Sequence, residues 1–120
     1  REHCFRVWNE LTAEEIKFWN LFLSWNSYDT DNIYLVVNEF QAYLLQHEIK
    51  TADFYFKEVV IPRIKRDKPG QEYFLDSFID TYPDSFIRVH EKLEEVLWNE
   101  LQVRGGDIAK IELMRRGNEN

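Results

Sequence analysis

Apolar residues recur at helical rather than alternating spacing along most of the chain, and polar clusters separate the apolar stretches. The clearest stretch runs from about Asp84 to Val103, where apolar positions fall three or four residues apart. These positions are Phe86, Val89, Leu93, Val96, Leu97 and Leu101. The 120 residues include only 4 Gly and 3 Pro, too few for the frequent turns of an all-β fold. The pattern predicts an all-α fold, a compact bundle of five or six helices.

Capping and helix-breaking residues divide this pattern into elements. Thr12 and Glu15 have the spacing of a capping box, so the first helix is expected to begin at Thr12 and to end within residues 26–31. Pro62 lacks the N–H that a helix interior needs, so a helix that begins at Thr51 should kink or end there. The other expected helices cover about 31–46, 72–81 and 84–103, with a break at 67–70 and a short last helix or docked tail at 108–114.

Length and charge bound the kinds of protein this chain can be. Residues 1–120 fit a single helical domain. The formal net charge of -7 opposes binding to nucleic acid or to an anionic membrane surface. No apolar run approaches the ~18 residues of a spanning helix. The chain begins at Arg1 rather than Met, and we expect it to be a fragment of a longer protein.

One carboxylate stands out within the most apolar stretch. Residues 33–45 read IYLVVNEFQAYLL, and Glu39 is expected to lie in the middle of an apolar face formed with Leu35, Val36, Ala42 and Tyr43. A helix that is apolar on nearly all sides is normally buried, so this helix should be the most buried element. A buried carboxylate must be paired, neutralised or bound to a metal. The alternatives are an internal ion pair, a place at the rim of the core, or a metal site.

The sequence NEFQAYL at residues 38–44 resembles the helix that carries the third zinc ligand of gluzincin metallopeptidases. In that family an HExxH helix gives two His ligands and the general-base Glu. A Glu on a later helix, often followed three residues on by Ala, completes the zinc site. The resemblance covers roughly residues 5–46 and includes a segment similar to the spacer of uncharacterised bacterial proteins of this type. The spacer residues are Phe5-Arg6, Trp8, Phe18-Trp19 and Tyr28-Asp29.

This resemblance implies that Glu39 is a zinc ligand, but the chain contains no HExxH. We therefore expect the zinc-binding helix to lie upstream, in a missing N-terminal part of the same protein. The intact protein would hold zinc and act on a peptide or protein substrate. A catalytic zinc needs three protein ligands, so the chain alone is expected to bind no zinc and to be inactive. Exposed apolar surface would also allow a homo-oligomer. The alternative is a helical interaction or scaffolding domain without catalytic activity, in which Glu39 forms a structural ion pair.

Other candidate groups have simpler interpretations. Residues 90–94 read HEKLE, close to HExxH, but the change of the second His to Glu removes a nitrogen ligand. His90 is therefore interpreted as a histidine at the edge of the core. His47 suits the end of a helix, and the adjacent His3 and Cys4 are too few for a metal site.

A basic cluster follows Pro62. It consists of Arg63, Lys65, Arg66 and Lys68. These charges suit the C-terminal end of a helix and a solvated turn. The functional alternative is that Arg63 reaches a substrate carboxylate or a developing oxyanion near Glu39.

Overall fold

The computed structural model describes residues 2–103, and within this range all regular structure is helical. The elements, in chain order, are α1 (Glu2–Glu10), α2 (Ala13–Trp25), α3 (Ile33–Leu45), α4 (Ile49–Phe54), the π-helix η1 (Tyr55–Val60), α5 (Ile61–Asp67), the 3-10 turn η2 (Pro69–Gln71), α6 (Glu72–Thr81) and α7 (Ser85–Val103). Because α4, η1 and α5 follow one another without a gap and η2 leads into α6, these elements form six helical segments. The predicted all-α bundle of five or six helices is confirmed.

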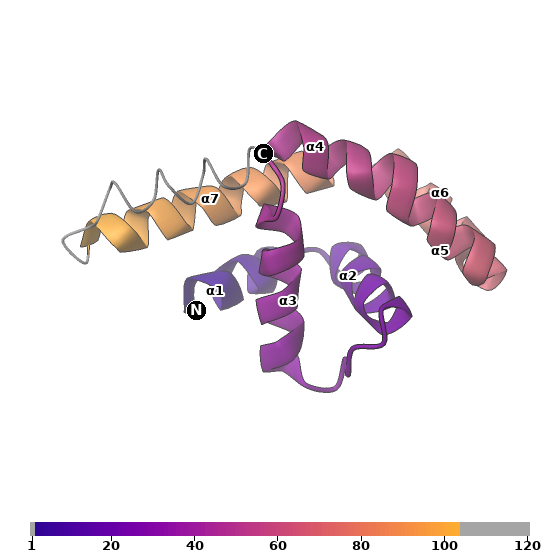
Figure 1. The fold of residues 1–120 in the computed structure, drawn as a ribbon, viewed down its shortest axis with the longest axis horizontal. Coiled ribbons are helices and arrows are strands. Elements are labelled where there is room, and N and C mark those ends of the chain that lie inside the picture. Colours follow the sequence, from indigo (N-terminus) through magenta and orange to yellow (C-terminus); the bar gives the residue numbers. More distant parts are fainter. Residues whose placement is uncertain (1, 104–120) are drawn as a thin grey trace.

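Helix α7 brings the two halves of the chain together. It packs against α1, α3 and α4, while α6 packs against α2 and α5. Figure 1 shows the rod formed by α4, η1 and α5 extending away from α3, with α6 beside α5. Residues that are distant in sequence therefore meet in one core.

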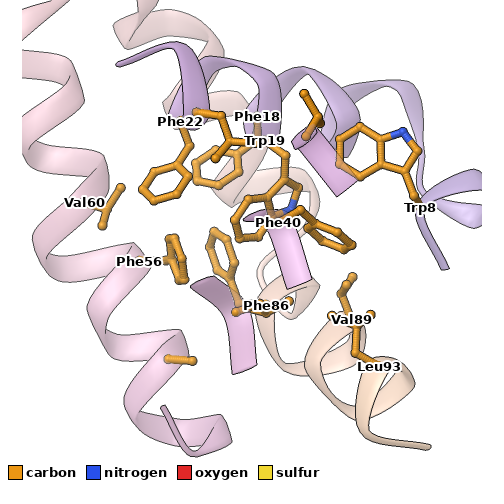
Figure 2. Close-up of a cluster of buried hydrophobic side chains, with 14 of the residues drawn as sticks. Trp8, Phe18, Trp19, Phe22, Phe40, Phe56, Val60, Phe86, Val89 and Leu93 are labelled. Carbon is orange, nitrogen blue, oxygen red and sulfur yellow. The ribbon is translucent and has the colours of Figure 1, made fainter. Parts of the chain in front are cut away.

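Aromatic rings fill that core (Figure 2). The largest fully buried side chains include Phe18, Trp19, Phe22, Phe40, Phe56, Phe78 and Phe86. Phe18 stacks on Phe78 with ring centroids 5.0 Å apart, and its edge contact with Phe86 is 5.2 Å. Such ring pairs add to the free energy gained from burial alone. Ring contacts in the core therefore join α2 to α6 and α7.

The capping prediction at α2 is confirmed. The Thr12 side chain accepts a hydrogen bond from the Glu15 backbone N–H at 3.1 Å, and Glu15 Oε1 accepts one from the Thr12 N–H at 2.9 Å. The predicted limits of α6 also agree with the structure, and α7 begins one residue after the predicted Asp84. Two other helix starts differ slightly from the prediction. Helix α3 begins at Ile33, capped by Asn32, rather than at about residue 31, and α4 begins at Ile49, capped by Glu48, rather than at Thr51.

Of the two outcomes predicted at Pro62, a kink or an end, the end is wrong, because the helix continues to Asp67. The π-helix η1 explains this. The N–H of Ile61 bonds to the carbonyl of Phe56, five residues back rather than four. A widened turn just before Pro62 accommodates both the ring and the missing N–H, which would otherwise disrupt a regular α-helix.

One helix was missed by the sequence analysis, and one predicted element cannot be compared with the structure. The missed helix is α1, although Cys4, Val7 and Trp8 are spaced three and four residues apart and are buried in the core. The tail or helix expected at 108–114 lies outside the described residues.

Candidate functional site

The face of α3 that carries Glu39 is not the face that packs into the core. The buried residues of α3 are Val36, Val37, Phe40 and Leu44. Glu39 lies about 120° around the helix from the middle of that face and is only partly buried, while Ala42 is exposed. The apolar face centred on Glu39 is therefore not the face that is buried, and Glu39 lies at the rim of the core, one of the alternatives that the sequence left open.

Helix α3 is also not the most buried element. It contains four buried residues, whereas α2, which has the same length, contains five. The start of α3 is open, with Ile33 43% and Tyr34 74% exposed. The sequence of α3 is apolar on nearly all sides, but its packing partners cover only one of them.

Two tyrosines accompany Glu39 at the edge of the core. Tyr28 and Tyr43 place their hydroxyl oxygens 3.3 Å apart, and the Tyr43 ring packs edge-on against Phe22 with centroids 5.0 Å apart. The hydrogen bond with Tyr43, partial desolvation and the negative charge of nearby Glu39 raise the pKa of Tyr28 to about 12. Tyr28 is therefore a neutral hydroxyl beside the carboxylate at physiological pH.

The position of Tyr28 follows from the way α2 ends. Ser27 has a positive φ of 68°. Its N–H bonds to the Ser24 carbonyl, and the Tyr28 N–H bonds to the Leu23 carbonyl. This pair of bonds is a Schellman motif, in which the residue with positive φ is usually Gly. The motif turns the chain so that Tyr28 reaches Tyr43 on α3.

Glu39 forms no ion pair with any Lys, Arg or His among the described residues. Within the same part of the chain, no group of three His, Cys, Asp or Glu residues could hold a metal ion. The Glu39 site thus offers one carboxylate and two hydroxyls. This set can accept or donate hydrogen bonds and can supply one metal ligand, but not a complete metal site.

Glu15, and not Glu39, is the carboxylate that is buried and paired within the fold. It is 1% exposed, and its Oε2 accepts hydrogen bonds from Ser85 Oγ at 2.6 Å and from Arg88 at 2.7 Å. Burial alone would raise the pKa of Glu15, but the bonds from Ser85, Thr12 and Arg88 outweigh it and lower the pKa. The capping-box motif identified Glu15, whereas no local signal pointed to its partners 70 and 73 residues away.

The histidines and the cysteine considered as candidate metal ligands do not form a common site among the described residues. His90 is buried, as expected for a core histidine. His47 lies in the turn between α3 and α4, where its ring is 5.6 Å from that of Tyr55. Cys4 is buried, and burial raises the pKa of its thiol. The side chain of His3 lies outside the described part.

The basic cluster is placed on α5 and in the turn that follows. Lys65 forms an ion pair with Asp76 of α6, and Arg66 pairs with the adjacent Asp67 at 3.3 Å. Neither Arg63 nor Lys68 is within ion-pair distance of Glu39. These contacts fit the interpretation of the cluster as helix-end and turn charges.

Comparisons with protein-family models, with characterised proteins and with solved structures found no match to this chain. Among the described residues, no helix is both long and apolar enough to cross a membrane.

Proposed function

We propose that this domain supplies Glu39 as one carboxylate ligand of a zinc site whose other ligands come from outside the described residues, as in a gluzincin-like metallopeptidase. The proposal rests on the partial burial of the Glu39 side chain and on its lack of an ion pair among the described residues. Glu39 is only partly buried and has no cationic partner in the described part of the chain, whereas Glu15 uses its carboxylate in the fold. A carboxylate that must bind a metal has to remain free of internal ion pairs.

The surroundings of Glu39 are compatible with the approach of a second helix. Ala42, one turn further along α3, is exposed, and a small side chain allows two helices to come close. The neutral Tyr28 hydroxyl lies beside the carboxylate and adds no competing charge, and it contacts the Tyr43 hydroxyl. The substrate of such a site would be a peptide or protein, as the family resemblance implies.

Zinc content tests this proposal. The whole gene product, purified without chelators, should contain about one equivalent of zinc, and Glu39→Gln should lose most of it because an amide is a poorer ligand than a carboxylate. Glu58→Gln, which removes an exposed carboxylate on η1, is the matched control and should keep the zinc. A zinc-free wild-type protein, or equal zinc in all three proteins, would refute the proposal. The 120-residue chain alone should bind no stoichiometric zinc and show no peptidase activity.

A second candidate function is protein binding without catalysis, and the open start of α3 favours it. Tyr34 is 74% exposed, Ile33 is 43% exposed, and the Tyr34 ring lies 5.4 Å from that of Phe5 on α1. Exposed apolar side chains that lie together are typical of contact surfaces. Sedimentation of the wild type and of Ile33→Ser/Tyr34→Ser would distinguish a homo-oligomer, which the double substitution should dissociate, from a monomer.

A further inference from the structure

Helix α3 presents an uncharged face to solvent, away from its buried side. Tyr34, Asn38 and Ala42 are spaced four residues apart and are all exposed, so their side chains form one ridge along the outside of the helix. We refer to these three residues as the α3 ridge. Glu39, beside the ridge, is the only charged residue of α3, whereas 31% of the whole chain is charged. The ridge therefore lacks the charges that are typical of a helix face in contact with water alone.

The side chains of the α3 ridge are complementary to one another about its middle residue, Asn38. Tyr34 lies four residues before Asn38, and Ala42 lies four residues after it. A carboxamide both donates and accepts hydrogen bonds, so two Asn38 side chains can bond to each other. The large Tyr34 ring and the small Ala42 side chain lie at equal distances on either side of this point. The ridge is therefore complementary to a reversed copy of itself.

We propose that the α3 ridge binds the α3 ridge of a second copy of this chain, antiparallel to it, about a two-fold axis at Asn38. This arrangement places Tyr34 of each copy against Ala42 of the other, so each contact occurs twice, as in any isologous interface. A parallel pair would set the two Tyr34 rings against each other and leave a gap between the two Ala42 side chains, which close packing disfavours. The pairing rests on the second candidate function, protein binding, because a second copy would take the place beside Ala42 that the zinc proposal assigns to another helix.

Tyr34 is the residue expected to contribute most to this contact. Its side chain is 74% exposed, and its ring lies edge-on to Phe5 of α1 with centroids 5.4 Å apart. A ring that is already held by a neighbour loses less side-chain entropy on binding. Because Tyr34, Asn38 and Ala42 are uncharged, their burial in the dimer desolvates no charge. One helix packed on one helix makes a small interface, so the dimer is expected to be weak and to form at high protein concentration.

Sedimentation equilibrium of the full chain at concentrations up to about 1 mM, which reaches weak complexes, tests the pairing. The wild type should show a monomer–dimer equilibrium. Tyr34→Lys and Ala42→Glu should each raise the dissociation constant by about tenfold or more, because each substitution alters both contacts of the symmetric dimer. Phe54→Lys is the matched control. It changes an aromatic ring on α4 that is 62% exposed, and it should dimerise like the wild type.

A mixture of Tyr34→Lys and Ala42→Glu tests the antiparallel register. In the mixed dimer one contact sets the introduced amine against the introduced carboxylate, and the other keeps Tyr34 against Ala42, so the mixture should dimerise more tightly than either variant alone. A mixture no tighter than its components would overturn the antiparallel pairing, although a wild type that dimerises would still support protein binding. A wild-type chain that stays monomeric over the whole concentration range would overturn self-association through the ridge altogether. Neither result bears on the zinc proposal, which the zinc content of the whole gene product decides.

Discussion

Glu15 and Glu39 are carboxylates with different surroundings in the same fold. Glu15 is enclosed and accepts hydrogen bonds from Thr12, Ser85 and Arg88, so its charge ties the start of α2 to the start of α7. Glu39 lies at the edge of the core next to Tyr28, with no cation beside it in the described part of the chain. The first carboxylate is paired within the fold, whereas the second has no ion pair among the described residues.

Removal of the Glu15 charge should destabilise the chain and change its response to acid. Glu15→Gln loses the ion pair with Arg88, whose own side chain is 51% exposed, so the expected loss at pH 7 is about 1–2 kcal/mol of unfolding free energy. The pKa of Glu15 is lowered in the folded chain from 4.5. Its contribution is therefore present above pH ~4.5 and lost as the pH falls through the lowered pKa.

Urea unfolding at pH 7 and at about pH 3 measures both effects. The difference between wild type and Glu15→Gln should shrink at the lower pH, while Glu91→Gln, an exposed carboxylate on α7, should match the wild type at pH 7. An equal difference at both pH values would show that the Glu15 charge does not contribute in this way.

Replacement of Ser27 by glycine should stabilise the folded chain. It has the positive φ of a Schellman motif, a conformation that costs an L-residue about 1–2 kcal/mol, part of which the larger chain entropy of Gly offsets. We expect Ser27→Gly to raise the unfolding free energy by about 0.5–1 kcal/mol. Asn26→Gly, at a φ of -87°, should instead lower it, because the Asn26 side chain bonds to the Phe22 carbonyl. Thermal melts in which Ser27→Gly is the less stable of the two would contradict this account.

At the scale of elements, the sequence was most informative where local chemistry sets a helix end. The capping box placed the start of α2, and the helix predicted over 72–81 has the limits of α6. The sequence was least informative where tertiary packing determines whether a helix continues and which of its faces is buried. Pro62 stays within a helical rod because η1 widens before it, and α3 exposes part of its apolar sequence because α1, α2, α4 and α7 cover the other side. Periodicity predicts that a helix forms, but not which of several apolar faces is buried.

The shared aromatic core predicts that elements distant in sequence unfold together. Phe18 contacts rings from η1, α6 and α7 and is fully buried, so Phe18→Ala should cost about 3–5 kcal/mol. Phe54→Ala removes a ring that is 62% exposed and should change the unfolding free energy by no more than about 0.5 kcal/mol. Calorimetry can compare the two, and similar effects from both substitutions would contradict the assignment of Phe18 to a shared core.

The candidate site depends on contacts between segments that are distant in the sequence. Glu39 was recognised from its own helix, but its neighbour Tyr28 comes from the end of α2 and reaches it through the turn at Ser27. The partners of Glu15 lie 70 and 73 residues away. A zinc site completed from outside the described residues would extend this pattern, since its ligands would also meet only after the chain has folded.

Chemical unfolding of Glu39→Gln beside Glu15→Gln shows whether the Glu39 carboxylate helps to hold the fold together. Both substitutions remove one negative charge and keep nearly the same side-chain shape. We predict that Glu39→Gln unfolds within about 0.5 kcal/mol of the wild type, while Glu15→Gln is measurably less stable at pH 7. A loss of several kcal/mol in Glu39→Gln would show that its charge is paired within the fold and would contradict its role as a free metal ligand.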